Sequence, residues 1–348
     1  MKTQYIQIDQ DNPDLVQIEP AAAIIRQGGL VAFPTETVYG LGANGLDPLA
    51  VQRIFAAKGR PADNPLILHI AERDELAALV REAPAWLAPV LDRFWPGPLT
   101  VVLPRAKCVP DIVTAGLDSV AVRLPSLAAA RALIRAAGVP IAAPSANLSG
   151  RPSPTTAAAV LADMAGRIEM VLDGGPCDVG LESTVLDCTT AIPTILRPGA
   201  VTLEMLEHCL GRVQVADATD IGTASVPRAP GMKYRHYAPV APLVLFSHDA
   251  IQGGQGLLAR LNEAQRTGQK VGAIVSVEVA ALLPDAVEVV IHGSRENPAE
   301  AATTLYQSLR WFDTHPVDVI FAEGVPELGI GRALMNRLYK AASSLGEV

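Results

Sequence analysis

One stretch decides the fold class: Gly28-Gly29-Leu30-Val31-Ala32-Phe33-Pro34-Thr35-Glu36-Thr37-Val38-Tyr39-Gly40. Residues 20–27 before it have apolar positions at helical spacing, and the two glycines end that helix. Residues 30–33 form a short, wholly apolar run, which predicts a strand buried on both faces. Polar residues follow on a loop, where binding groups are often found. This order of helix, strand and polar loop indicates an α/β fold.

The same alternation continues through the first two hundred residues. Asp47-Pro48 predicts a helix start, and Gly59 ends that helix after Lys58. A second amphipathic helix is predicted over 72–82. Further strands are predicted at 66–70, 99–103, 119–124, 139–143, 168–172, 183–187 and 194–196. About nine strands with few helices between the later ones predict a mixed sheet that is part antiparallel.

The pattern changes after residue 216. Residues 217–242 contain four prolines and no helical period, which predicts a linker. Beyond it, strands at 243–246, 271–275, 288–291 and 317–322 alternate with helices at 255–267, 298–314 and 331–345, as in a small doubly wound parallel sheet. We therefore predict a first domain over 1–212, a linker over 213–241 and a smaller Rossmann-like domain over 242–348.

Composition narrows the class of protein. An apolar share of 49% excludes a disordered chain, and a net charge of -8 excludes a broad basic surface for nucleic acid. Four cysteines without a C-x-x-C pair are typical of a reducing compartment, and the six histidines have no zinc-ligand spacing. No signal peptide and no apolar run of about 18 residues is present. We expect a soluble, cytoplasmic protein with no membrane contact and no dedicated metal site.

The sequence contains one possible phosphate-binding motif and lacks another. Gly40-Leu-Gly42-Ala-Asn-Gly45 matches G-x-G-x-x-G, but six residues separate it from the preceding strand, where a dinucleotide fingerprint needs none. The glycines are therefore interpreted as serving a tight backbone turn. A Walker A sequence is absent, so a bound nucleotide must be held in another way.

Local charge predicts where an anion could bind. Residues 119–162 and 221–248 contain no Asp or Glu. Their basic residues are Arg123, Arg131, Arg135, Arg151, Arg228, Lys233, Arg235 and His236. Arginine suits phosphate because its planar group donates two parallel hydrogen bonds. The alternative is that Arg131 and Arg135 merely belong to an alanine-rich core helix.

Three polar loops beside the predicted strands, at 33–40, 58–65 and 143–150, carry hydroxyls, amides and cations. Such groups suit a small polar substrate together with a phosphate. The alternative is that Thr35, Ser145 and Asn147 are ordinary turn and cap residues.

These loops also carry a family resemblance. Lys58-x-Arg60-Pro61 together with Ser145-x-Asn147 resembles the signature tetrad of the YrdC-type domain, and residues 33–41 and Arg197-Pro-Gly resemble its other conserved segments. Residues 229–239 resemble the interdomain linker of the long, two-domain form, although Arg228-Ala229 stands where a serine is more usual. The chain is identified as resembling the threonylcarbamoyl-AMP synthases. The resemblance implies a YrdC-type twisted mixed sheet with flanking helices, followed by a smaller doubly wound parallel-sheet domain.

The resemblance implies a nucleotidyltransferase reaction. L-threonine, bicarbonate or CO2, and ATP would form L-threonylcarbamoyladenylate and pyrophosphate, for N6-threonylcarbamoyladenosine modification of tRNA. Mg2+ would accompany the ATP, and a downstream tRNA threonylcarbamoyl transferase would take the product.

The resemblance also implies roles for individual residues. The implied catalytic residues are Lys58, Arg60, Ser145 and Asn147. Those implied to bind L-threonine are Thr37, His69, Arg123, Ala143 and Ser183. Those implied to contact ATP are Arg60, Asn64, Ser119, Ser145, Ser153, Arg197, Tyr234, Arg235 and His236. The acid-free linker is interpreted as a lid over the nucleotide.

Two other functions remain open from the residues. An RNA-binding module would use a basic concavity of the first domain, with direct tRNA contact, although the acidic net charge disfavours it. A different carbamoyl or adenylyl transferase would use the same loops with another amine.

Overall fold

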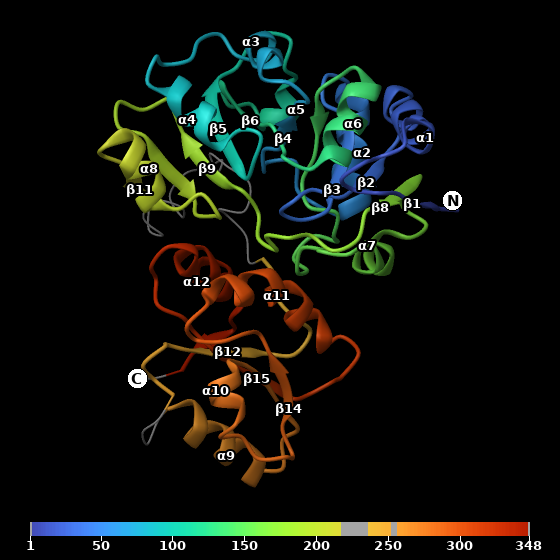
Figure 1. Ribbon diagram of the computed structural model, residues 1–348. Coiled ribbons are helices and arrows are strands. Elements are labelled where there is room, and N and C mark those ends of the chain that lie inside the picture. The colour runs from blue at the N-terminus through green and yellow to red at the C-terminus, as the bar shows by residue number, and fades with distance from the viewer. Residues whose placement is uncertain (1, 217–235, 252–255, 347–348) are drawn as a thin grey trace. The chain divides into compact units, whose positions relative to one another are not determined.

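A computed structural model of the protein describes residues 2–216, 236–251 and 256–346. Contacts divide the chain into two compact units, Met1–Ser149 with Ser153–Tyr234, and Gly150–Pro152 with Arg235–Val348. Most of the predicted linker, residues 217–235, lies outside the described residues. Each unit is an α/β structure (Figure 1).

The first unit contains one mixed sheet. Its strands are β1 (Gln4–Gln7), β2 (Val31–Phe33), β3 (Gly40–Asn44), β4 (Ile67–His69), β5 (Leu99–Pro104), β6 (Ser119–Arg123), β7 (Ile141–Ala142), β8 (Met170–Asp173), β9 (Thr184–Asp187), β10 (Thr194–Arg197) and β11 (Gln214–Val215). Their order is β1-β8-β2-β3-β7-β4-β6-β5-β9-β10-β11, and parallel and antiparallel pairs both occur. The predicted mixed α/β fold is confirmed. Strands β1, β3 and β11 were not predicted.

Helices cover both faces of this sheet. They are α1 (Leu15–Arg26), α2 (Pro48–Lys58), the 3-10 turn η1 (Arg73–Glu75), α3 (Leu76–Leu79), α4 (Leu87–Phe94), α5 (Asp111–Thr114), α6 (Ala128–Ala137), α7 (Ala157–Met164) and α8 (Leu203–Leu210). Val31 and Phe33 pack into the core beneath α1 and α6, whereas Ala32 faces the core beneath α2. Successive strand residues thus point to opposite faces. Both faces of the sheet are covered here, which explains why all three residues of β2 are apolar and buried.

Local signals set some helix ends and not others. The side chain of Asp47 accepts a hydrogen bond from the Leu49 amide, and Gly59 adopts φ 62°, so α2 spans the predicted residues. The predicted helix over 72–82 was wrong beyond Leu79. Val80 forms an antiparallel bridge with Arg105, so the chain leaves the helix there to pair with another strand end.

The interpretation of the Gly40–Gly45 glycines as serving a tight turn was wrong for Gly40 and Gly42, although Gly45 does lie in a turn. Gly40, Gly42 and their neighbours form β3, between β2 and β7. A Cβ on Gly42 would lie 2.8 Å from the Ile141 side chain and 2.9 Å from the Phe33 ring. The glycine therefore provides room for these two side chains.

The second unit contains a parallel sheet. Its strands are β12 (Leu243–Phe246), β13 (Val271–Val275), β14 (Glu288–Ile291), β15 (Val319–Glu323) and β16 (Ser344–Leu345), and its helices are α9 (Leu257–Arg266), α10 (Val277–Ala280), α11 (Pro298–Trp311) and α12 (Ile330–Ala341). The strand order is β14-β13-β15-β12-β16, which confirms the smaller parallel sheet. Counted along the chain it runs 3-2-4-1-5, whereas the Rossmann order begins 3-2-1-4.

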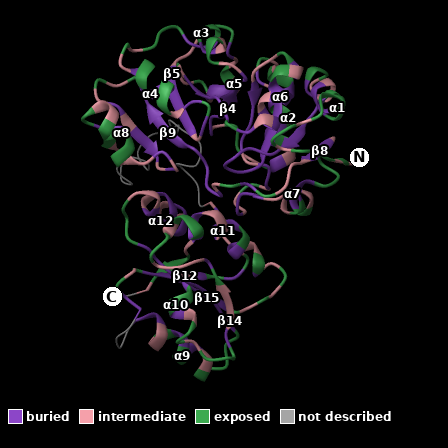
Figure 2. Cartoon of the chain, viewed as in Figure 1, coloured by how far each residue is buried: buried purple, intermediate pink, exposed green. Residues whose placement is uncertain are grey.

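The two outer strands of this sheet, β16 and β14, differ from the central ones. The helix predicted over 331–345 ends at Ala341, because the chain becomes extended at Ala342 and residues 344–345 pair with β12. Strand β14 is partly exposed, as an edge strand is expected to be (Figure 2). Among the described residues, no helix is long and apolar enough to cross a membrane.

Candidate functional site

Strand register places a row of side chains on one face of the first unit's sheet. His69 on β4 is the register partner of Arg123 on β6, which also pairs with Thr100 on β5. Thr100 pairs with Val185 on β9, and Val185 pairs with Arg197 on β10. Directly paired residues of neighbouring strands share a face. Three predicted ligand-binding residues, His69, Arg123 and Arg197, thus come from separate strands to one surface.

Arg123 is the central member of this row. Its buried guanidinium donates to the Thr37 hydroxyl (2.9 Å), to Oε1 of Glu36 (2.6 Å) and to the carbonyl of Gly97 (3.4 Å). A guanidinium has five N–H donors, so two of them remain available. They can bind a carboxylate in the bidentate geometry that arginine favours.

Glu36 contacts Arg123 and was not among the site residues predicted from the sequence. It lies within the polar loop after β2 and is buried, although it carries a charge. Its Oε2 is buried and accepts no hydrogen bond from any residue that the structure describes. Leaving a buried carboxylate oxygen unpaired is unfavourable. The signal in the sequence was its place between Thr35 and Thr37, two polar residues of the same loop.

Ser183 joins the row through a second set of hydrogen bonds. Its hydroxyl lies 2.7 Å from that of Thr100 and accepts from Arg197 Nη2 at 3.1 Å. The Arg197 Nε also donates to the Ser183 carbonyl. The residue before it, Glu182, accepts a 2.6 Å hydrogen bond from the Ser153 hydroxyl. The structure therefore places Ser153 and Ser183 in neighbouring loops of one polar surface.

His69 is a neutral member of the site. It is buried, its ring packs edge-on against Phe33, and its Nδ1 has no hydrogen-bond partner within the described chain. Burial, and then the nearby charges of Arg123 and Arg197, lower the pKa of His69 to about 3. The imidazole thus adds no positive charge at neutral pH.

Replacing His69 by leucine is expected to flatten the pH dependence of stability below neutral pH. An unfolded histidine has a pKa of about 6.5, whereas folded His69 has a pKa of about 3. Between these values the unfolded chain binds more protons, so stability falls as the pH falls through this window and is unaffected above it. Urea unfolding of the parent protein and of His69→Leu at about pH 5 and about pH 7.5 tests this. If both proteins lose the same free energy of unfolding between the higher and the lower pH, a buried neutral His69 is contradicted.

Lys58 anchors the loop that carries Ser145 and Asn147. Its ammonium donates to the carbonyls of Ser145 (2.5 Å) and Asn147 (2.6 Å), and lies 3.4 Å from Asn147 Oδ1. The Ser145 hydroxyl donates to the same Oδ1. A buried ammonium so surrounded by acceptors holds the loop in one conformation and leaves a positive charge beneath it. The tetrad residues Lys58, Ser145 and Asn147 are therefore in direct contact.

The loops at 34–39 and 143–146 are paired by their backbones. The Leu41 amide donates to the Pro144 carbonyl and the Ala146 amide donates to the Tyr39 carbonyl. A Cβ on Gly40 would lie 3.3 Å from that of Ala143. The Lys58 cluster and the loop containing Thr37 consequently lie side by side, with Ala143 between them.

Three further predicted residues of the first unit lie toward the start of β6, away from Arg123. They are Ser119, Arg60 and Asn64. Ser119 begins β6 and Arg123 ends it, on the same face, so about 13 Å separates them at the usual strand rise. Arg60 donates to the carbonyls of Asn64 and Pro65. Asn64 is buried, and its Oδ1 has no hydrogen-bond partner among the residues described. The site is thus elongated along β6.

Three predicted ATP-binding residues are not placed with this site. Tyr234 and Arg235 lie outside the described residues. His236 is described and belongs to the second unit, where its ring centroid lies 5.6 Å from that of Tyr237.

In the folded chain, carboxylates from other segments lie beside arginines of the acid-free stretch at 119–162. Arg131 and Arg135 both form ion pairs with Glu72, and Arg151 pairs with Asp313. These arginines were wrongly expected to contribute local positive potential, because the tertiary structure brings carboxylates from distant segments to them. Arg123 also has a carboxylate partner and still retains free donors.

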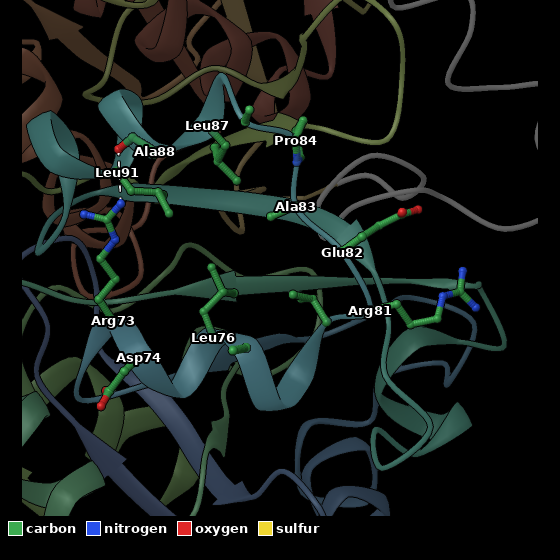
Figure 3. A pocket seen from close by; sticks show the side chains of 13 residues that line it. Arg73, Asp74, Leu76, Arg81, Glu82, Ala83, Pro84, Leu87, Ala88 and Leu91 are labelled. Atoms are coloured by element: carbon green, nitrogen blue, oxygen red, sulfur yellow. Dashed lines mark hydrogen bonds between the residues drawn. The ribbon is translucent and has the colours of Figure 1, made fainter.

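A separate cavity of about 430 Å³ lies between α3 and α4 (Figure 3). Its wall is largely apolar, with Leu76, Leu87 and Leu91 among its residues. The arginines at its rim are already paired, Arg73 with Asp92 and Arg81 with Asp118. None of the predicted site residues lines it, so it is distinct from the site on the sheet.

Comparison with known families places both units. Residues 23–199 match the family described as "Telomere recombination", and residues 201–343 match the family described as "Threonylcarbamoyl-AMP synthase, C-terminal domain". The two matches together cover most of both units.

Individual relatives are similar over nearly the whole chain. Threonylcarbamoyl-AMP synthase of Pyrococcus abyssi is 48% identical over 326 residues, covering 94% of each chain. The Bacillus subtilis protein of the same name is 48% identical over 331 residues, covering 94% of this chain and 93% of its own. The crystal structure of P. abyssi Sua5 complexed with L-threonine superposes with a TM-score of 0.91 at 46% identity, covering 99% of each chain.

Proposed function

The chain belongs to the threonylcarbamoyl-AMP synthase family, and from this premise we propose that the surface around Arg123 is where it joins L-threonine to the adenylyl group of ATP. The enzyme is an adenylyl-transferring synthase of threonylcarbamoyl-AMP, the precursor of the threonylcarbamoyl group on tRNA. The observation that carries the assignment of the site is the pair of unused N–H donors on buried Arg123.

L-threonine binds with its carboxylate on Arg123. The two remaining guanidinium donors match the two oxygens of a carboxylate, and the Thr37 hydroxyl accepts from the same guanidinium. The Ser183 hydroxyl bonds to that of Thr100, the register partner of Arg123. The solved relative bound to L-threonine supports this substrate for the site. Neutral His69 suits the same surface, since a second cation next to Arg123 would repel the ammonium of the substrate.

Glu36 receives the substrate's ammonium group. Its unpaired Oε2 provides a hydrogen-bond acceptor, and its charge is held in place by Arg123 through Oε1. The amine must lose a proton before it can combine with CO2 to form a carbamate, and a nearby carboxylate lowers the barrier to that transfer. Bicarbonate or CO2 supplies the carbonyl carbon.

ATP occupies the length of the site from the Lys58 cluster toward Ser119. A carbamate oxygen attacks the α-phosphorus and pyrophosphate leaves, a reaction that depends on positioning and on neutralising charge. Lys58 supplies positive charge under the Ser145 loop, and Arg60, Asn64, Ser153 and Arg197 supply polar contacts. The span of about 13 Å between Arg123 and Ser119 accommodates an amino acid linked to a nucleotide.

Mg2+ accompanies the triphosphate in this proposal. Mg2+ keeps several waters and is often bound through substrate phosphates rather than by a protein cage. The reaction is placed in the cytoplasm, with a downstream tRNA threonylcarbamoyl transferase consuming the product.

The test of the function is formation of the adenylate. Purified protein is incubated with ATP, MgCl2, labelled bicarbonate and L-threonine, and the products are identified by mass spectrometry. Labelled threonylcarbamoyl-AMP and pyrophosphate are expected; L-serine and L-valine in place of threonine serve as controls. Adenylate formation with another amino acid in preference to threonine would point to a different carbamoyl or adenylyl transferase.

The Thr37 hydroxyl provides a test of the substrate pose. Thr37→Val keeps the shape of the side chain but removes the acceptor for Arg123, so KM for L-threonine is expected to rise about tenfold while KM for ATP changes little. Steady-state kinetics with each substrate varied in turn measures both values. Thr267→Val, an exposed change in the second unit, is the matched control; equal increases in both KM values would contradict the assignment.

A further inference from the structure

The parallel sheet of the second unit has a topological switch point at its carboxyl edge. Strands β13 and β15 are neighbours in the sheet. The chain leaves β13 toward β14 on one side, and leaves β15 past β12 toward β16 on the other. Because the two connections diverge, open parallel sheets have a crevice at such a point, and ligands bind there.

A cavity of about 350 Å³ lies at this edge of the sheet. Its lining residues follow the ends of β12, β13 and β14, and they are His248, Asp249, Ile251, Glu278, Val279, Leu282 and Arg295. This volume is at the lower end of the range for sites that bind small molecules. The wall combines one arginine, one histidine, two carboxylates and three aliphatic side chains.

Arg295 is held in position by a buried carboxylate. Its Nε donates to Oε1 of Glu323 at 2.6 Å, and Oε2 of Glu323 accepts the Ser276 amide at 2.8 Å. Glu323 is almost fully buried at the end of β15. The Nη2 of Arg295 is buried and has no hydrogen-bond partner among the residues that the structure describes. The guanidinium is therefore fixed while a donor remains unused.

Glu278 provides a negative charge in the wall of the same cavity. It accepts hydrogen bonds from the Ser294 hydroxyl (2.6 Å) and the Arg295 amide (3.2 Å), which orient the carboxylate. The Ser294 bond, followed by the backbone amide of Glu278, lowers the pKa of this carboxyl to about 2, so the carboxylate is charged at neutral pH. A carboxylate has about four acceptor positions, so Glu278 can bind a further donor.

We propose that this cavity binds a free α-amino acid with an aliphatic side chain. The carboxylate of the amino acid pairs with Arg295, its ammonium pairs with Glu278 and Asp249, and its side chain contacts the aliphatic residues. Two cavity carboxylates beside one arginine disfavour a phosphate-bearing ligand, and the charged groups disfavour a pure hydrocarbon. A zwitterion satisfies both charges at once. The proposal concerns the second unit alone and does not depend on the reaction assigned to the first.

Calorimetry on the full chain tests the ligand class, with L-leucine and L-valine as probes. Saturable binding of one or both is expected. The analogues 4-methylpentanoate and 3-methylbutylamine, which lack the ammonium and the carboxylate respectively, are expected to bind at least about tenfold more weakly than L-leucine. Failure of both amino acids to bind, or equal binding of either analogue, would overturn the proposal.

Substitutions inside and outside the cavity show where L-leucine binds. Glu278→Gln is expected to weaken L-leucine binding about tenfold or more, and Leu282→Ser to weaken it severalfold. The exposed change Glu263→Gln on α9 and the first-unit change Thr37→Val are expected to leave it unaltered. Thermal unfolding confirms that each variant is folded. Binding that survives both cavity changes but is lost in Thr37→Val would assign the amino acid to the first unit and overturn the proposal.

Discussion

Replacing Arg123 by methionine is expected to lower kcat/KM for L-threonine at least roughly a hundredfold, because the variant loses the bidentate partner of the substrate carboxylate. The same change leaves Glu36 buried without its cation. Breaking a buried ion pair in this way destabilises a protein by about 3–5 kcal/mol. Steady-state kinetics and urea unfolding measure the two effects separately.

A second variant separates the substrate role of Arg123 from its structural role. In the double variant Arg123→Met with Glu36→Gln, the buried charge is gone, so most of the lost stability is expected to return. Activity is not expected to return, since neither side chain can then bind the charged groups of threonine. Recovery of activity together with stability would show that Arg123 acts only through the fold.

Lys58→Met is expected to lower kcat/KM roughly a hundredfold and stability by about 2 kcal/mol. The ammonium satisfies acceptors of Ser145 and Asn147 in a buried place, and methionine leaves them unpaired. Both substrates should be affected, because the loop that carries Ser145 and Asn147 loses its anchor and the site loses a positive charge. Kinetics and urea unfolding again provide the readouts.

Lys58→Arg extends this test, with Lys107→Met as an exposed control. Arginine keeps the charge but is planar and larger, so it cannot direct its donors to the same close acceptors. It is expected to remain at least about tenfold less active than the parent. Full activity in Lys58→Met would remove Lys58 from the site.

The family resemblance predicted most of the candidate site as a set of segments, and the structure decided which atoms meet. Thr37, His69, Arg123 and Ser183 were expected together, and strand register and hydrogen bonds bring them to one surface. Glu36 was missed because nothing in a loop sequence shows that one of its side chains is buried with an unpaired oxygen. Charge along the chain misled at Arg131 and Arg135, whose carboxylate partner lies about sixty positions away.

By itself the sequence determined the features that depend on neighbouring residues: the ends of α2 at Asp47 and Gly59, the buried strand at 31–33, and the alternation that makes the second unit a parallel sheet. Only the tertiary structure decided that Gly40–Asn44 is a strand, that the chain leaves its helix at Val80, and that Glu36 is buried against Arg123 with one carboxylate oxygen unpaired among the described residues. The physical reason is range. A helix cap or an apolar run depends on residues within a few positions, whereas strand pairing and the burial of a charge depend on partners from distant parts of the chain.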